Sequence, residues 1–561
     1  MRKLTFLDGF MGLAFLVALA IRLTGLGSIP LNDSEAKWAF QALELARGGS
    51  TVGAETGVIL WSSLLFGLLG GSNFLARFIP AFIGSWIVFT PIFFQKKIGY
   101  VTTVIFSFGL ALDPLLVGIS RQVDGLSMSI TLAFLAAGFW YWRKDLMFGL
   151  CLGIYLITGP SAWLGLTILG VIVLVNRIFL SEKKDNADLQ KGILVHWKSI
   201  FLGLGISLFV FGTLLMFTPT GISGALEGLV AYWNSWKGNL ENQYSAGMII
   251  MAVLNYLLMP VLLGISGMIQ GIRSKNKEDL KMTAWVLSTL LVLIIYPGFE
   301  IRHLAWISPL FWIIAARQIS KISWKPRKGP SLLMGVVTLV MMVFILINFN
   351  TLVNSLEPGL RLSAIGISFL IILLTGFLVW WGWSFDEARF GFGLGVLIIL
   401  MGLTFAGAWR SAGLNGKINL EMTNLSPAFV DSDLMDISIG DLSEWNTGER
   451  EFLDVVSLGV QSPAVDWMMR DLVNYQKVNS ITAGENPDII IAASDAVLGQ
   501  TELYTGQEFT LREIPIWDGL TARQWIGWLM RRELMVNQET ILLWVRSDLF
   551  PGTTSNKSTG E

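Results

Sequence analysis

The sequence predicts an α-helical polytopic membrane protein of about thirteen transmembrane helices that carries a C-terminal soluble α/β domain. Of the 561 residues, 53% are hydrophobic and 14% are charged, whereas a soluble domain is roughly 45–50% apolar and about 25% charged. Apolar runs of about 15–22 residues, close to the length that a ~30 Å hydrocarbon layer requires, recur from Phe6 to Ala408. Acidic residues gather after these runs. The composition excludes a soluble enzyme, a disordered protein and a nucleic-acid binder.

Thirteen apolar runs are expected to form the transmembrane helices, and charged or turn-forming residues separate them. The runs are Phe6–Leu26, Phe74–Phe94, Val101–Val117, Leu126–Trp142, Leu146–Ile157, Ala162–Phe179, Ile200–Phe217, Met248–Ile269, Thr283–Tyr296, Leu304–Ile319, Leu332–Ile347, Leu362–Trp381 and Phe392–Ala408.

The charges are distributed unevenly along the chain. From Ser411 onward there are 10 Lys and Arg against 22 Asp and Glu, and the preceding part carries 30 basic and 19 acidic residues. With Met1 in the cytoplasm, 21 of these 30 basic residues fall in cytoplasmic loops and nine fall outside or at outer helix ends. Basic residues favour the cytoplasmic side of a membrane protein. We therefore expect a multi-pass protein of the cytoplasmic (inner) membrane with a cytoplasmic N-terminus and an extracytoplasmic C-terminal domain.

Two domains follow from this pattern. Residues 1–410 form the transmembrane domain, and its outer loop 27–73 is expected to carry two interfacial helices, Glu35–Arg47 and Val58–Leu69. Residues 411–561 form the soluble domain, in which strand-like and helical patterns alternate. The expected strands are Asp488–Ala493 and Thr540–Val545, and the expected helices are Ala464–Tyr475 and Ala522–Glu533.

Three charged clusters lie at outer ends of the predicted spans, and each has a structural and a functional interpretation. The first is Asn32–Lys37, where Asp33 or Ser34 could cap a helix or a carboxylate could be catalytic. The second is Ser120–Asp124, where a local pair of Arg121 with Asp124 would contribute little. The third is Glu300–His303, where Arg302 could simply anchor the chain at the headgroups.

The combination of side chains in these clusters would suit a lipid-linked phosphate substrate. An arginine binds phosphate oxygens with its planar fork of N–H groups, and a carboxylate takes a proton from an incoming hydroxyl. Asp33 and Asp124 lie at outer ends of neighbouring early spans, so we expect them to approach across one cavity, with Arg302 or His303 on another side. Spacing alone does not show this convergence.

A set of short motifs runs along the chain: Arg22–Ala36, Ala42–Gly48, Phe74–Pro80, Leu112–Pro114, Ser120–Arg121 with Asp124, and Arg302–His303 with Pro309. These motifs resemble the GT-C glycosyltransferases, the relatives of protein O-mannosyltransferases and of the aminoarabinose transferase of lipid A. Ser34 stands where the family usually has the first residue of an Asp-Glu pair, and Asp33 lies one residue before it. The run Trp467–Asp471 resembles the tails of a subgroup labelled flippase-activity-associated proteins.

The resemblance implies a glycosyltransferase that moves a sugar from a polyprenyl-phosphate-linked donor to a glycan, lipid or protein acceptor at the outer face of the membrane. Membrane lipids would be further partners, and nucleic acid would not. Asp33 is the leading candidate for the base. The other residues implied are Asp124 and Glu35 as active-site carboxylates, and Arg121, Arg302, Arg77 and His303 for the lipid phosphate or local structure.

Two points stay open. Some relatives hold a divalent cation, for which His303 with Glu300 or Glu35 is conceivable, so the cofactor is undetermined. The alternative function, motivated by Ser34, is a non-catalytic accessory protein for handling or flipping lipid-linked sugars. A transporter of another class is disfavoured, because the suggestive charges lie at the outer ends of the spans and the sequence shows no related halves.

Overall fold

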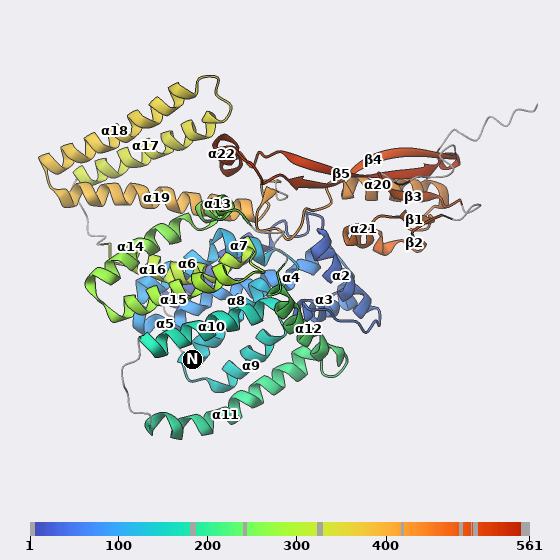
Figure 1. The fold of residues 1–561 in the computed structure, drawn as a ribbon, viewed down its shortest axis with the longest axis horizontal. Coiled ribbons are helices and arrows are strands. Elements are labelled where there is room, and N and C mark those ends of the chain that lie inside the picture. The colour runs from blue at the N-terminus through green and yellow to red at the C-terminus, as the bar shows by residue number, and fades with distance from the viewer. Residues whose placement is uncertain are drawn as a thin grey trace, which may run out of the picture.

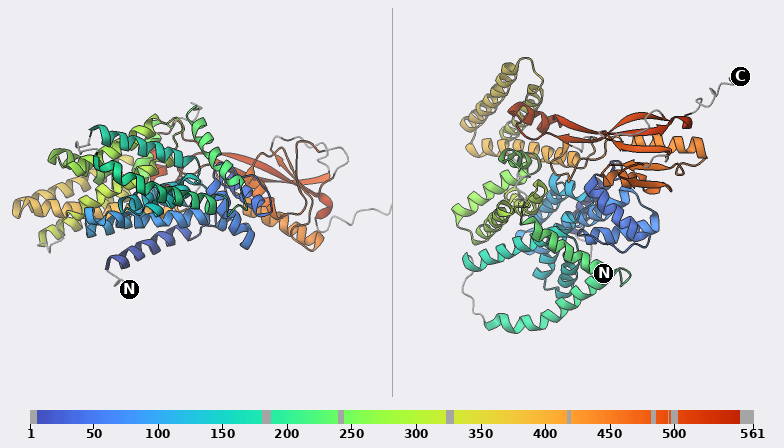
Figure 2. Two further views of the ribbon diagram at one scale, coloured as in Figure 1. Left: turned by 90° about the horizontal axis from the view of Figure 1, so that it is seen from below. Right: turned by 45° about the vertical axis from the view of Figure 1, so that its right-hand side comes forward.

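A computed structural model shows a helical body with a sheet domain at one end of it (Figure 1). The structure describes residues 6–179, 187–238, 244–322, 329–416, 420–481, 486–494, 496 and 503–550, with no side chains for residues 179 and 187–196. The basic N-terminus and Lys183-Lys184 lie outside the described residues. Two further views show the sheet domain projecting from the same end of the body (Figure 2).

The helical body contains helices α1 to α19 with short 3₁₀ and π segments between some of them. Its first half comprises α1 (Phe6–Leu23), α2 (Asp33–Ala46), α3 (Thr56–Leu69), α4 (Asn73–Ser85), η1 (Trp86–Phe89), α5 (Thr90–Ile98), α6 (Tyr100–Ala111), α7 (Pro114–Ser120), α8 (Leu126–Tyr141), α9 (Asp145–Leu156), α10 (Pro160–Phe179) and α11 (Ala187–Ser207). Its second half comprises η2 (Leu208–Gly212), α12 (Thr220–Ser235), α13 (Ala246–Tyr256), α14 (Leu258–Ser274), α15 (Lys277–Ile295), η4 (Ile301–Trp306), α16 (Ser308–Ser320), α17 (Gly329–Leu352), α18 (Pro358–Gly382) and α19 (Phe385–Ser411).

Each of the thirteen predicted spans overlaps at least one helix. Among the described residues, six helical segments are long and apolar enough to cross a membrane: α1, the continuous segment Asn73–Ile98, α10, α17, α18 and α19. The number rises to eight if each of two bent pairs, α6 with α7 and α13 with α14, is one span. The protein is thus an integral membrane protein by fold and composition, and the count of thirteen stays a prediction.

The bent pairs differ from the straight helices expected at Val101–Val117 and Met248–Ile269. The chain turns by 49° between α6 and α7 and by 95° between α13 and α14. Asp113 has extended backbone angles and caps α7 through its side chain, directly before Pro114. Leu257 leaves the helical conformation, and Pro260 stands in the first turn of α14. A proline is accepted in the first turn of a helix but cannot continue an earlier one, so each run divides at this point.

The C-terminal domain is α/β, with one sheet in the strand order β2-β1-β3-β5-β4. Strand β1 pairs in parallel with β2 and β3, whereas β5 pairs antiparallel with β3 and β4. Its elements are α20 (Ser432–Thr447), β1 (Val455–Leu458), α21 (Pro463–Met468), η6 (Met469–Asp471), β2 (Tyr475–Val478), β3 (Ile489–Ala493), β4 (Tyr504–Pro515), α22 (Ala522–Arg531), β5 (Val536–Arg546) and η8 (Ser547–Leu549).

Three of the four elements expected in this domain form close to their predicted bounds, as β3, β5 and α22. The fourth, a helix over Ala464–Tyr475, is wrong in its second half. The helix tightens at Met469–Asp471, Leu472 is extended, and Tyr475 begins β2 beside β1. Pairing with β1 satisfies the backbone groups of these residues in the sheet, which overrides their helical pattern.

The outer-loop helices share a hydrophobic core with the C-terminal domain. Ala36 and Ala39 of α2 and Phe66 of α3 belong to one buried cluster with Val465 and Trp467 of α21. Helix α22 instead packs against the body, where the fully buried Trp528 joins the core of the transmembrane helices. The C-terminal domain is therefore held at two places.

Candidate active site

The first charged cluster lies at the N-terminus of α2, and its cap is Asn32. The Asn32 side chain accepts a hydrogen bond of 2.9 Å from the Glu35 N–H, and the Glu35 carboxylate accepts one of 3.2 Å from the Asn32 N–H. This reciprocal arrangement is a capping box. The expectation that Asp33 or Ser34 caps the helix is wrong, because the helix begins at Asp33, one residue earlier than a cap at Asp33 requires and two earlier than a cap at Ser34 requires.

Glu35 also forms a buried ion pair with Arg77 of α4. The Arg77 Nη2 and Nε donate to the two Glu35 oxygens at 2.6 and 2.8 Å, and both side chains are almost fully buried. Arg77 donates further to the carbonyls of Ile29 and Pro30, and the Val123 N–H donates to Glu35 at 3.1 Å. This pair therefore fixes the outer loop, α4 and the loop before α8 to one another.

Arg121 occupies a similar structural position at the end of α1. Its guanidinium donates to the carbonyls of Arg22 and Thr24 at 2.8 Å, of Gly25 at 3.1 Å and of Ile21 at 3.2 Å. The last carbonyls of a helix lack partners within the helix and carry partial negative charge. Arg121 supplies hydrogen-bond donors to these carbonyls, although it lies about 100 residues later in the chain.

Asp33 contacts the C-terminal domain. One carboxylate oxygen accepts hydrogen bonds from the Ser462 hydroxyl at 2.5 Å and from the Ala464 N–H at 3.0 Å. The other oxygen forms an ion pair with Arg512 of β4. These contacts dock the C-terminal domain onto α2, and a catalytic role for Asp33 stays a prediction.

A double-mutant experiment distinguishes a catalytic role of Asp33 from a role in docking the C-terminal domain. Asp33→Asn should lower the transferase activity that the family resemblance implies by about 10²–10⁴-fold if Asp33 is the base. If the carboxylate only docks the domain, Arg512→Gln should have the same effect as Asp33→Asn, and the double variant should be no worse than either. Initial rates and melting temperatures of the three variants measure this. Activity retained in Arg512→Gln but lost in Asp33→Asn contradicts the docking role.

The second and third clusters meet, although 178 residues separate them in the chain. The Arg302 guanidinium forms ion pairs with Asp124 through Nη1 and with Glu300 through Nε. The other Asp124 oxygen accepts the Leu126 N–H at 2.9 Å, so the carboxylate is oriented by the start of α8. Burial lowers the pKa of Arg302 to about 10, which leaves it charged at neutral pH.

Glu55 belongs to this cluster and did not emerge from the sequence. It is 8% exposed, and its carboxylate accepts the Gly125 N–H at 2.8 Å. A Cβ atom on Gly125 would lie 1.6 Å from the Thr158 carbonyl oxygen, and Gly159 has a φ of +114°, so both positions beside this carboxylate need glycine. Burial raises the pKa of Glu55 to about 7, against the opposing charge of Arg302. The sequence feature that could have identified Glu55 is its position as a single acidic residue directly before an apolar run.

His303 is held in a way that keeps it neutral. Its Nδ1 accepts the Glu300 N–H at 3.0 Å, and burial together with Arg302 lowers its pKa to about 3. Among the residues that the structure describes, no group of three or more His, Cys, Asp and Glu side chains could hold a metal ion. The Glu35 carboxylate, one of the conceivable ligands, is bound to Arg77.

A cavity of about 500 Å³ opens beside the cluster formed by Glu55, Asp124, Glu300 and Arg302. Glu300 and Arg302 line it together with Lys237 and Tyr244, and Asn424 belongs to the segment that links α19 to the C-terminal domain. Gln122 holds this segment by donating to the Thr423 carbonyl at 3.0 Å and to the Asn424 side chain at 3.3 Å. The cavity is therefore bounded by the helical body on one side and by the linker on the other.

Comparison with known proteins identifies the fold. The structure is similar to that of ArnT from Cupriavidus metallidurans bound to undecaprenyl phosphate, with a TM-score of 0.57 and 13% identity over 96% of this chain and 99% of that one. The apo state of the same protein gives a TM-score of 0.55 and 12% identity over 96% and 98% of the two chains. The chain has the GT-C fold.

This confirms the resemblance seen in the sequence at the level of fold. An oligosaccharyltransferase from Archaeoglobus fulgidus, tethered with an acceptor peptide, is a more distant match with a TM-score of 0.44 and 10% identity over 85% of this chain and 64% of that one. No family model and no curated protein sequence matches the chain.

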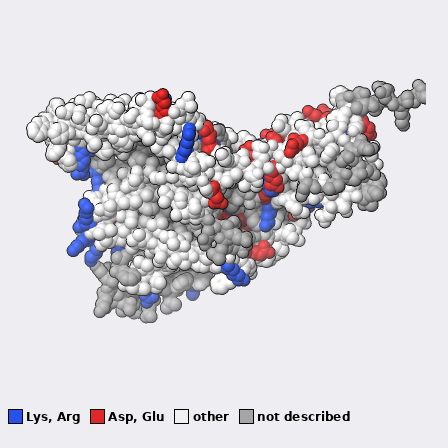
Figure 3. Space-filling model, turned by 45° about the horizontal axis from the view of Figure 1, so that its top comes forward, with Lys and Arg blue, Asp and Glu red and all other residues white. Residues whose placement is uncertain are grey.

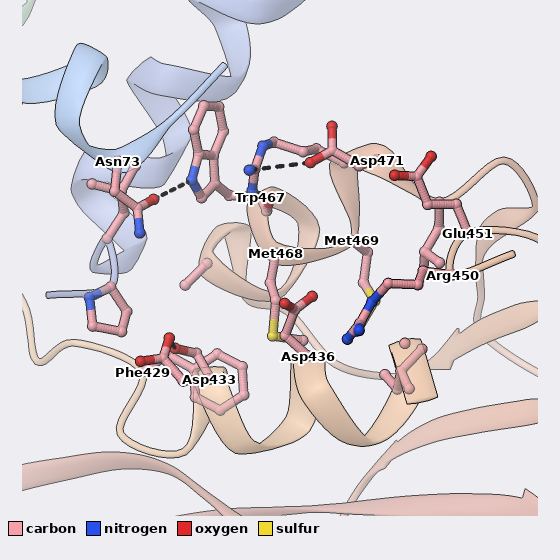
Figure 4. Close-up of a pocket in the computed structure, with 18 residues that line it drawn as sticks. Asn73, Phe429, Asp433, Asp436, Arg450, Glu451, Trp467, Met468, Met469 and Asp471 are labelled. Atoms are coloured by element: carbon pink, nitrogen blue, oxygen red, sulfur yellow. Dashed lines mark hydrogen bonds and ion pairs between the residues drawn. The ribbon is translucent and has the colours of Figure 1, made fainter. Parts of the chain in front are cut away.

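A second cavity, of about 290 Å³, lies between the outer loop and the C-terminal domain of this GT-C fold (Figure 4). Asp433, Asp436 and Glu451 stand around it. Asn73, Trp467, Arg470 and Asp471 also line it, where Trp467 donates to Asn73 at 2.8 Å and Arg470 pairs with Asp471 at 3.1 Å. None of the residues predicted from the sequence as catalytic or phosphate-binding lines this cavity. The cavity beside Arg302 is therefore the candidate active site.

Proposed function

We propose that the protein is a membrane glycosyltransferase that moves a sugar from a polyprenyl-phosphate-linked donor to an acceptor hydroxyl at the outer face of the membrane. The observation that carries the proposal is the Arg302 cluster at a cavity of about 500 Å³, set in a fold shared with a protein whose structure holds undecaprenyl phosphate. A cation flanked by carboxylates suits a reaction in which a phosphate leaves and a hydroxyl loses its proton.

In the proposed reaction the acceptor hydroxyl oxygen attacks the anomeric carbon of the sugar. The bond between that carbon and the phosphate oxygen breaks, and polyprenyl phosphate leaves with the electron pair. Arg302 binds the phosphate oxygens, and Asp124 orients the guanidinium through their ion pair. A carboxylate at the cavity takes the hydroxyl proton. Among the described residues, Glu300 is the carboxylate that lines the cavity, and Asp33 remains the candidate suggested by the family resemblance.

The experiment that tests this function is incubation of the purified protein with labelled polyprenyl-phosphate sugars and a cell-envelope extract. A labelled product that depends on Arg302 supports the transferase. Binding of the labelled donor without any product, across a panel of donor sugars and extracts, would favour the alternative of an accessory protein for lipid-linked sugars.

The rate of transfer should depend on pH around neutrality. Burial raises the pKa of Glu300 to about 7. Below this pH the carboxylate is protonated and cannot accept a proton. We expect kcat/KM to fall about tenfold per pH unit below pH ~7 and to level off above it. Glu300→Gln should lower the rate and remove this dependence. If Glu300→Gln keeps the dependence and Glu55→Gln removes it, Glu55 is the proton acceptor instead.

The orientation of the protein is proposed from the 21-to-9 distribution of basic residues in the transmembrane domain. A reporter that is active only outside the cytoplasm should be active when fused after Gly413 and inactive when fused at Lys183. Activity at both positions, or at neither, would contradict the thirteen-span topology with an extracytoplasmic C-terminal domain.

A further inference from the structure

A groove lies on the transmembrane body at the helix ends that point away from the candidate active site. It encloses about 470 Å³ and is lined by residues from the last turns of α10, the first turns of α15 and the end of α5. The lining includes three cations, Lys97, Arg177 and Lys281, and the apolar or aromatic side chains of Val173 and Trp285. We call this feature the basic groove.

The basic groove carries an excess of positive charge. The one acid among the described residues that line it, Glu278, lies 3.6 Å from Lys97, and both side chains are about half exposed, so their attraction is weak. Within the described part of the chain, Arg177 and Lys281 form no ion pair or hydrogen bond. Figure 3 shows Lys and Arg gathered at this end of the molecule, whereas Asp and Glu gather over the opposite half.

The floor of the basic groove joins two helices through polar side chains. The Trp285 indole N–H donates to the Asn176 side chain at 3.1 Å, which ties α15 to α10. Trp285 is half-buried. A tryptophan that presents an apolar ring and a satisfied N–H is suited to the boundary between hydrocarbon and headgroups.

The groove continues into apolar surface toward the middle of α10. Val173 lines the groove and is 55% exposed, and Leu169, one turn earlier on the same face of α10, is 54% exposed. Gly170 beside them leaves open space, since an added Cβ atom would meet nothing within 4 Å. A phosphate held at the cations would therefore have an apolar track next to it.

We infer that the basic groove binds the phosphate of an anionic phospholipid, with an acyl chain along Leu169 and Val173. Arg177 supplies a fork of N–H groups for phosphate oxygens, and Lys281 and Lys97 supply point charges. Basic pockets between transmembrane helices recognise anionic headgroups in this way. The apolar track distinguishes a lipid from free phosphate, which the cations alone would also attract.

Native mass spectrometry of the full-length chain tests the inference, with phosphatidylglycerol and phosphatidylcholine of identical acyl chains as probes. The wild type should retain phosphatidylglycerol about tenfold more than phosphatidylcholine. The variant Arg177→Gln/Lys281→Gln should lose that preference. The matched control is Arg273→Gln, an exposed cation in the last turn of α14 that does not line the groove; it should keep the preference.

Three results would overturn the assignment of a phospholipid to the basic groove. An unchanged preference in the double variant, or an equal loss in Arg273→Gln, overturns it. If glycerol 1-phosphate displaces phosphatidylglycerol at equal concentration, the groove recognises free phosphate and the lipid assignment is overturned. The single variant Arg177→Gln changes an exposed side chain and replaces the double variant if the latter is not monodisperse.

Discussion

Arg302→Gln should reduce sugar transfer by about 10²–10³-fold, because removing one preorganised group that stabilises developing charge costs about this factor. Arg302 lines the cavity with its side chain 14% exposed, and Asp124 and Glu300 form ion pairs with two of its guanidinium nitrogens. Glutamine keeps a hydrogen-bond donor for these carboxylates but lacks the charge that the leaving phosphate requires. The effect should appear mainly in kcat, since the phosphate gains charge in the transition state.

Initial rates with a labelled polyprenyl-phosphate sugar, together with a melting curve, measure this effect separately from folding. Lys237→Gln is the matched control, since Lys237 is a second cation that lines the same cavity but has no carboxylate partner among the described residues. We expect its rate to change by less than about tenfold. Arg302→Lys should be intermediate because it restores the charge without the planar fork. Full activity of a folded Arg302→Gln variant would show that the phosphate binds elsewhere.

Arg77→Met should destabilise the protein by about 3–5 kcal/mol, the usual cost of leaving one member of a buried ion pair without its partner. Glu35 is 2% exposed and would lose the guanidinium that donates to both of its oxygens. The carbonyls of Leu26, Ile29 and Pro30 would also lose the Arg77 donors. Because these contacts hold the outer loop beside the candidate active site, the loss should also lower activity.

The melting temperature of the purified variant measures the destabilisation. Arg450→Gln is the control, because Arg450 pairs with Asp441 at 3.2 Å while both side chains are more than half exposed; it should cost about 0–1 kcal/mol. Glu35→Gln/Arg77→Met should be less destabilised than the sum of the single variants, since it leaves no uncompensated charge. Additive effects would contradict a coupled pair.

The sequence alone determined the class of the fold and the positions of many of its elements, but it did not place β1, β2, β4 or α20. Hydropathy and helical periodicity are local properties, so the apolar runs of the transmembrane domain predicted where helices occur, and strands β3 and β5 were placed within a few residues. Hydropathy and periodicity did not predict the breaks in the helices at Asp113 and Leu257. A continuous apolar run shows that a segment is buried, whereas its direction depends on the helices packed around it.

The sequence also determined which charged clusters stand at helix ends, but only the tertiary structure decided which of them meet. Arg302 contacts Asp124, whereas Asp33 contacts Ser462 and Arg512. From the sequence, either aspartate could have been the partner of Arg302. Which way a side chain faces depends on the rotation of its helix and on the surface that covers it. That surface comes here from residues more than 400 positions away, a distance over which no local pattern carries information.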